Sequence, residues 1–173
     1  FIGGQDTYYE LEINAFGTLY EVFFIWEQAY ETGGYAHQPE FRRDAPGAQP
    51  WNGVGFTSHP RGPRIGFWQW DLPGLKAAVH VDGTLNDQSD RDRGWTAELA
   101  LPWASMRSLA QADGRALPPR PGDTWRMDFS RFNTYKEAPP AEDSSGWAWS
   151  PHGIWDSHIP EVWPYIHFSD QPL

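Results

Sequence analysis

Two alternating segments between Leu75 and Trp103 place the strongest constraint on the fold. Apolar residues occupy every second position of both segments: Leu75, Ala77, Val79 and Val81, then Trp95, Ala97, Leu99 and Leu101. A period of two is that of a β-strand that buries one face and exposes the other. The pattern predicts an antiparallel, half-buried strand pair that ends at Pro102-Trp103.

The connection between these two segments carries a high density of oxygen ligands. Its acidic and amide side chains are Asp82, Asn86, Asp87, Asp90 and Asp92. Ca²⁺ accepts six to eight oxygen ligands in varied geometry, which makes Asp82, Asp87, Asp90 and Asp92 candidate ligands, although the spacing is not that of an EF-hand. The alternative is a turn whose Asp and Asn side chains cap their own backbone, with Arg91 and Arg93 balancing the charge.

Short strands separated by Gly, Pro, Asn and Asp account for most of the remaining chain. Residues 8–14 alternate, and 19–26 are almost continuously apolar, which predicts a hairpin with its turn at 15–18. The segment from Glu31 to Arg64 has no period and is expected to be an extended loop. Residues 102–109 form the best helical stretch, and it is short.

Two further strands are predicted near the C-terminus, at 125–129 and 162–168. Evenly spaced strands with one short helix predict an all-β fold, an antiparallel β-sandwich of the jelly-roll type, in a single domain. The period-two positions predict a core that includes the following residues: Leu11, Ile13, Val79, Val81, Leu99, Leu101, Met127 and Phe129.

Composition narrows the classes of partner. The chain has 173 residues, a formal net charge of -10, no Cys and 11 Trp. The acidic balance argues against nucleic acid and anionic membranes, and leaves neutral ligands and cations. Disulfides and thiolate chemistry are excluded, and the sequence has neither a membrane-length apolar run nor a signal-peptide pattern.

The number of Trp residues exceeds what a core needs, so some indole rings are expected on the surface or along a groove. Trp95, Trp103 and Trp125 fall on strands or strand ends and are expected in the core. Four others occur in a segment dominated by turn residues: Trp147, Trp149, Trp155 and Trp163. Of these, Trp155 and then Trp149 are the candidates for ligand contact.

Five stretches together resemble the family 9 carbohydrate-binding modules in their broader, DOMON-like form. They are YYELEIN, AVHVDGTLND, GWTAELALPW, PPRPGDTWRMDFSR, and WSPHG with HIPEVWPYIHFS. The resemblance implies a β-sandwich that binds β-linked glucan or xylan sugars without catalysing a reaction, with structural Ca²⁺ and no organic cofactor. It further implies an oligo- or polysaccharide partner, an extracellular or periplasmic location and a linked glycoside hydrolase.

The resemblance also assigns roles to residues. The late stacking Trp of the family corresponds to Trp155, a sugar-binding Arg corresponds to Glu12, and a sugar-binding Gln falls near Ser130 and Arg131. A second stacking Trp would precede Phe1, so we expect the natural domain to start upstream of this residue. Independently of the family, aromatic rings stack on the C–H face of a pyranose while polar groups bind its hydroxyls.

Two other classes of function remain as alternatives. A DOMON-type haem domain would need axial ligands from Met106 or Met127 with His80 or His158. A small glycan-active enzyme would need paired carboxylates, such as Glu98 and Glu161. No nucleophile-elbow motif is present, and the six His do not show the spacing of a zinc site.

Overall fold

A computed structural model describes residues 1–54, 59–87, 89–133, 145–154 and 156–171 of the chain. Within these residues the fold is all-β and sandwich-like, with antiparallel strands and only short helical segments. The antiparallel β fold predicted from the period-two segments is therefore confirmed. No helix in the described ranges has the length and apolar character needed to cross a membrane.

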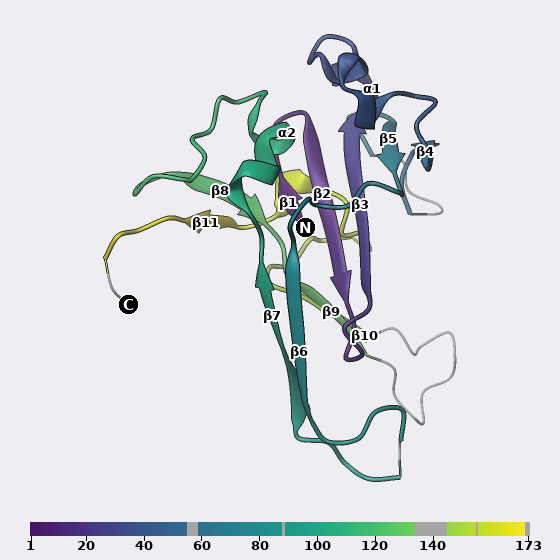
Figure 1. The fold of residues 1–173 in the computed structure, drawn as a ribbon, viewed down its shortest axis with the longest axis vertical. Coiled ribbons are helices and arrows are strands. Elements are labelled where there is room, and N and C mark those ends of the chain that lie inside the picture. The colour runs from purple at the N-terminus through teal and green to yellow at the C-terminus, as the bar shows by residue number, and fades with distance from the viewer. Residues whose placement is uncertain (55–58, 88, 134–144, 155, 172–173) are drawn as a thin grey trace.

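Seven strands form the main sheet, in the order β11-β8-β1-β2-β3-β5-β4. Its strands are β1 (Ile2–Gly3), β2 (Thr7–Ile13), β3 (Leu19–Trp26), β4 (Ala48–Trp51), β5 (Arg64–Phe67), β8 (Thr124–Met127) and β11 (Tyr165–His167). Two separate ribbons complete the described β structure: β6 (Lys76–Asp82) with β7 (Gly94–Ala100), and β9 (Ser130–Asn133) with β10 (Ser145–Ala148). Figure 1 shows the β6–β7 ribbon extending beyond the main sheet.

Helical segments are short and lie in the connections between strands. They are α1 (Glu27–Tyr30), η1 (Tyr35–His37), η2 (Pro39–Phe41), η3 (Trp103–Met106), α2 (Arg107–Ala110) and η4 (Pro160–Val162). The helix predicted at 102–109 is confirmed as the consecutive η3 and α2. Met106 and Leu109 anchor it because both side chains are buried in the core.

The two faces of β2 define the architecture. Tyr9, Leu11 and Ile13 point to one side, here called the inner face, and Tyr8, Glu10 and Glu12 point to the other, the outer face. The hairpin to β3 forms as predicted, because Asn14 accepts backbone hydrogen bonds across the turn and Gly17 takes the left-handed conformation that the turn requires.

The main hydrophobic core lies against the inner face. Its buried members are Tyr9, Phe23, Ile25, Tyr30, Tyr35, Phe41, Ile65, Phe67, Leu72, Met106, Leu109 and Trp125. Leu11, Leu101, Trp103 and Met127 pack on its margin, in agreement with their predicted core positions. The outer face carries a smaller buried cluster, formed by Tyr8, Val22, Phe24, Trp26, Ala29 and Trp163.

The core prediction was wrong for part of the β6–β7 ribbon and for Phe129. Leu99 is 39% exposed and Phe129 is 56% exposed, while Val79 and Val81 are only partly buried. The strands pair as predicted, but the ribbon leaves the core after its first residues, so little packs on its apolar side. Period two identifies a strand with two unlike faces, and it does not say that anything covers the apolar one.

The prediction of an extended loop at 31–64 was also incomplete. Tyr35 and Phe41 belong to the main core, and Ala48–Trp51 forms β4 at the edge of the main sheet. Pro50 obscured this strand, because proline interrupts a strand pattern and is tolerated mainly at sheet edges.

Candidate functional site

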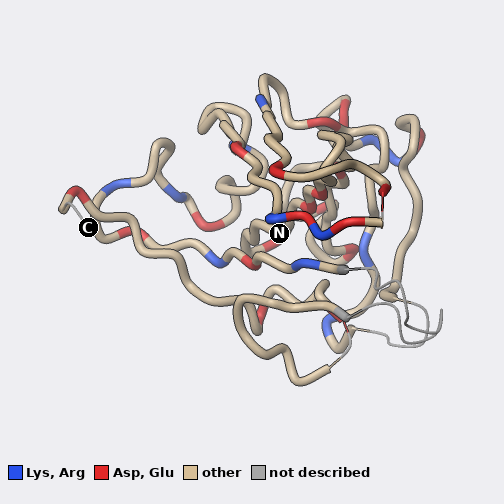
Figure 2. Tube along the Cα trace, turned by 90° about the horizontal axis from the view of Figure 1, so that it is seen from below, with Lys and Arg blue, Asp and Glu red and all other residues tan. Residues whose placement is uncertain are grey.

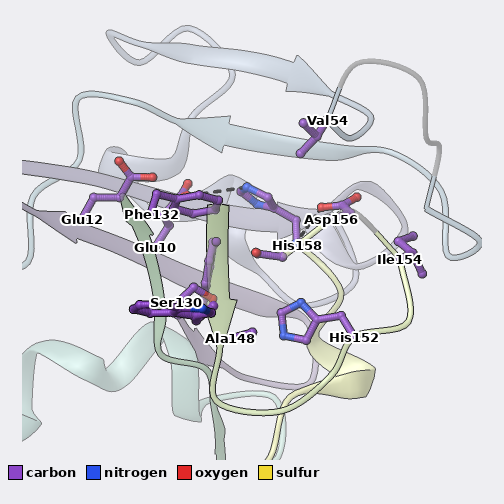
Figure 3. Close-up of a pocket in the computed structure, with 14 residues that line it drawn as sticks. Glu10, Glu12, Val54, Ser130, Phe132, Ala148, His152, Ile154, Asp156 and His158 are labelled. Carbon is purple, nitrogen blue, oxygen red and sulfur yellow. Dashed lines mark hydrogen bonds and ion pairs between the residues drawn. The ribbon is translucent and has the colours of Figure 1, made fainter. Parts of the chain in front are cut away.

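The outer face of the main sheet is hollowed between β2, the β9–β10 ribbon and the segment that follows β10. This hollow has a cavity volume of about 380 Å³. Its described lining is Phe1, Glu10, Glu12, Val54, Ser130, Phe132, Gly146, Trp147, Ala148, His152, Ile154, Asp156, Ser157 and His158. Figure 3 shows Glu10, Glu12, Phe132 and His158 gathered at one end, with His152 and Ile154 farther along.

The floor of the outer hollow is set by β2. Glu10 and Glu12 are two residues apart on one strand, so their side chains share the outer face, where repulsion from Glu12 helps to raise the pKa of Glu10. Glu10 is buried, whereas Glu12 is exposed at the mouth of the hollow. A pair of carboxyl groups this close shares a proton more readily than it carries two charges.

Burial raises the pKa of Glu10 to about 8, and repulsion from Glu12 adds to the effect. Glu10 is therefore mostly a neutral carboxylic acid at pH 7, able to donate a hydrogen bond as well as accept one. Such a group in a cavity is a functional-site signal, because a strongly shifted pKa is common at functional sites and burying a polar group lowers stability.

A hydrogen-bond chain runs beneath the hollow from Arg64 through Tyr8 to His158, and His158 lies beside Glu10. Arg64 Nη1 donates to the Tyr8 hydroxyl oxygen at 2.8 Å, and the hydroxyl lies 3.2 Å from His158 Nδ1. Because the Tyr8 oxygen already accepts, its hydrogen is free to donate to Nδ1, which leaves the ring proton of His158 on Nε2. That atom lies 3.5 Å from Glu10 Oε1.

Burial, and then the nearby Arg64 guanidinium, lower the pKa of His158 to about 3. The imidazole is therefore neutral at pH 7 and presents an N–H to Glu10 without a positive charge. The loop before it is held in place because Asp156 Oδ1 accepts the His158 backbone N–H at 2.8 Å. The chain orients Glu10 but gives it no charged partner.

One wall beside Glu10 and Glu12 is aromatic. A groove that adjoins the hollow is lined by Glu10, Glu12, Tyr20, Phe24, Trp51, Trp68 and His158. Trp68 Nε1 donates to the Tyr20 hydroxyl at 2.8 Å, which fixes the orientation of the indole. A Cβ atom at Gly66 would lie 2.1 Å from the Trp68 ring, so only glycine lets this ring lie against the sheet.

The β9–β10 ribbon supplies the opposite wall. Phe132 lies over Gly146 of the neighbouring strand, where a Cβ atom would approach the ring to 2.8 Å. Trp147 is also a lining residue of the hollow and is 58% exposed, as is Phe132. Exposed rings on both sides of a carboxyl pair make a slot suited to a flat, hydroxylated ligand.

His152 and Asp128 support the far end of the hollow. His152 Nε2 lies 3.3 Å from Asp128 Oδ1, and both side chains are buried, although the geometry does not make a hydrogen bond. Asp128 Oδ2 accepts a hydrogen bond from the Ser130 hydroxyl at 2.5 Å. Ser130 therefore lines the hollow with its hydroxyl oriented by a buried carboxylate.

The structure brings together only some of the residues predicted to bind sugar. Glu12 and Ser130 line the outer hollow. Arg131 and Trp149 are not among its lining residues: the Arg131 guanidinium lies 5.9 Å from the Trp147 ring centroid, and Trp149 packs against Phe129. Trp155, the first candidate for stacking, lies outside the described residues.

The acidic loop makes the hydrogen bonds of a self-capped turn. Asp92 Oδ1 accepts the Thr84 N–H at 2.7 Å, Asp90 accepts the Thr84 hydroxyl at 2.8 Å, and Asp87 accepts the Ser89 N–H at 2.9 Å. Asp82 lies 3.7 Å from Arg93. No group of three ligand-type side chains clusters in the part of the chain that the structure describes. Calcium binding at Asp82, Asp87, Asp90 and Asp92 stays a prediction.

The residues of the two alternative functions are distributed over different parts of the fold. Met106 and Met127 pack with the inner core, His158 lies on the outer face, and His80 is exposed on the β6–β7 ribbon. Glu98 is also exposed on that ribbon.

The second carboxylate considered for a glycan-active enzyme has a local partner. The Glu161 carboxylate oxygen Oε2 lies 3.1 Å from His59 Nε2. Glu161 is not a lining residue of the outer hollow. Neither the axial pair nor the carboxylate pair considered from the sequence converges on one site.

Sequence reasoning missed most of the aromatic wall. Trp51 and Trp68 come from a segment without periodicity, and only the sheet order β3-β5-β4 places them beside β2. A signal for Glu10 was present, because it alternates with Tyr8 and Glu12 on a strand next to apolar positions. Comparisons of the chain with protein-family models, curated proteins and solved structures find no match.

Proposed function

We propose that this chain is a non-catalytic carbohydrate-binding domain whose ligand lies across the outer face of the main sheet. The observation that carries the proposal is the slot in which aromatic rings of β9–β10 and of the Trp51–Trp68 groove flank the carboxyl groups of Glu10 and Glu12. A pyranose has an apolar C–H face and a polar rim, and this arrangement matches both.

The resemblance to family 9 modules is an independent support, since it predicts a sugar-binding β-sandwich from different residues. The two arguments meet at Glu12 and Ser130, which line the hollow and also occupy positions of the family's polar sugar contacts. They differ on the stacking rings, where the geometry favours Trp68 and Trp147 and the resemblance favours Trp155.

The two carboxyl groups offer polar contacts to a sugar. Glu10 and Glu12 lie two residues apart on one strand, so both side chains face the hollow. As a pair, they suit hydroxyl groups that donate and accept hydrogen bonds.

Titration calorimetry with β-linked glucan and xylan oligosaccharides tests the proposal. We expect modest affinity, and we expect Trp68→Ala or Trp147→Ala to weaken binding about ten- to a hundredfold, the usual loss for a stacked aromatic contact of about 1 to 3 kcal/mol. Trp149→Ala is the control, because Trp149 is 67% exposed, close to the 58% of Trp147, but is not a lining residue of the hollow. Absence of glycan binding by the wild type would overturn the proposal.

A further inference from the structure

The groove beside the outer hollow combines aromatic walls with carboxyl groups. Tyr20, Phe24, Trp51 and Trp68 form its walls, while Glu10 and Glu12 form its floor. The face of an aromatic ring carries negative potential and attracts cations, Trp most strongly. The aromatic rings and the carboxyl groups thus point, independently of each other, to a positively charged group.

The lining of the groove and of the adjoining hollow is acidic. Glu10, Glu12 and Asp156 contribute carboxyl groups, and no described lining residue is Lys or Arg. The whole sequence has the same bias, with 23 Asp and Glu against 13 Lys and Arg and a net charge of -10, and Figure 2 shows where the acidic and basic residues of the described chain lie along the trace. A ligand cation would enter a favourable field.

The nearest protein cations bind groups other than the carboxyl pair, and Nε and Nη2 of Arg64 are buried without a hydrogen-bond partner among the described residues. Arg64 lies behind Trp51, with its guanidinium carbon 4.4 Å from the ring centroid, and it donates to Tyr8 and to the His158 carbonyl. The amino group of Phe1 donates to the Asp128 carbonyl at 2.9 Å. Neither is hydrogen-bonded to Glu10 or Glu12, so the carboxyl pair keeps its capacity for an external cation.

We propose that the preferred ligand is an amino sugar with an unacylated amino group, whose ammonium lies between the Glu10–Glu12 pair and the aromatic wall of Trp51 and Trp68. The inference rests on the proposed function, which supplies the sugar ring. It adds that the charge of the ligand, more than the pattern of its hydroxyls, decides which sugar is bound. Acylation of the amine removes the charge and adds bulk at the point of contact.

Proton linkage gives the inference a second, independent readout. Burial, and then repulsion from Glu12 and Asp156, raise the pKa of Glu10 to about 8, while the Phe1 amino group acts in the opposite direction. Neutral His158 faces the same carboxyl group. A bound ammonium stabilises the ionised form and lowers this pKa. At pH 6, binding of an amino sugar should therefore release up to one proton, whereas a neutral sugar should release almost none.

The experiment compares three β-1,4-linked trisaccharides by calorimetry at pH 6 and low salt, in two buffers of different ionisation enthalpy. The three ligands are the trisaccharides of glucosamine, of N-acetylglucosamine and of glucose. We expect the glucosamine trisaccharide to bind about tenfold more tightly than the other two, with proton release and with an advantage that shrinks as salt is added. Trp68→Ala should lower the affinity for every sugar that the wild type binds.

Two variants and a matched control locate the effect. Glu12→Gln and Glu10→Gln should abolish the preference for glucosamine, while Glu98→Gln, which makes the same charge change on the distant β6–β7 ribbon, should retain it. Glu12 is exposed, so its variant tests the site even where the buried Glu10→Gln fails to fold. Equal affinity for the glucose and glucosamine sugars would overturn this inference and leave the proposed function standing. Absence of binding to every sugar would overturn both.

Discussion

The two faces of strand β2 differ in polarity and in how they are covered. On the inner face, Tyr9 is buried in a closed apolar core, and Leu11 packs on the margin of that core. On the outer face, Glu10 and Glu12 line an open hollow with aromatic walls. The inner face gains stability from packing, while the outer face retains buried polar groups that lower it. The proposed function accounts for this difference by assigning the outer face to the ligand.

The largest effect should come from the inner face. Phe23 is 1% exposed and stacks on Phe41 with ring centroids 4.7 Å apart, so Phe23→Ala should lower the free energy of unfolding by about 3 to 5 kcal/mol. Trp68→Ala on the outer face should cost much less, since this ring is only partly buried. Urea denaturation measures both. Equal losses would remove the distinction between the two faces.

The outer face should impose a pH dependence on stability. Between pH 6.5 and 8 the folded state binds more protons than the unfolded state, because the pKa of Glu10 is raised to about 8, and the free energy of unfolding falls as the pH rises. The expected fall is about 1 to 2 kcal/mol over these 1.5 pH units, because Glu10 is half deprotonated by pH 8. Glu10→Gln should abolish it, and an unchanged slope in this variant would contradict the assignment.

A second pH effect has the opposite sign. The pKa of His158 is lowered to about 3, so between pH 3 and 6.5 the unfolded state binds the extra proton and stability rises with pH. Between pH 4.5 and 6.5 the two groups oppose each other, which predicts a broad maximum there. His158→Gln should flatten the acid limb in thermal melts at a series of pH values; an acid limb as steep as in the wild type would exclude His158 as its source.

Gly66 allows a sharper separation of binding from folding. In Gly66→Ala the new methyl group would displace the Trp68 ring, with a stability cost of about 1 kcal/mol because that ring can move toward solvent. Glycan affinity should nevertheless fall nearly as far as in Trp68→Ala. Normal affinity in a folded Gly66→Ala protein would exclude Trp68 from the ligand contact.

The smallest effect concerns the acidic loop, which lies apart from both faces. Asp92→Ala removes the carboxylate that accepts the Thr84 N–H and should cost about 0.5 to 1.5 kcal/mol, as does the loss of an ordinary hydrogen bond. If the loop is self-capped, Asp92→Ala lowers the free energy of unfolding by the same amount in calcium as in EDTA. A larger loss in calcium would instead establish the predicted metal site.

The fold was more predictable from sequence than the site. Local periodicity identified β2, β3, β6 and β7 almost to the residue, because the alternation of a strand depends only on a few consecutive residues. The exposure of Leu99 was not predictable, because it depends on which element packs against the ribbon. The site depends on long-range sheet order, which brings Trp51 and Trp68 to Glu10, and no local pattern encodes that order.

Indole N–H signals in ¹⁵N-labelled protein test the comparison of the two faces most directly. A saturating β-1,4-linked trisaccharide should shift the signals of Trp51, Trp68 and Trp147, which line the groove and the outer hollow, and leave those of Trp103 and Trp125 in the inner core unchanged. Assignment follows from single Trp→Phe variants. Shifts confined to Trp149, or unchanged signals from Trp51, Trp68 and Trp147 on binding, would contradict the placement of the ligand on the outer face.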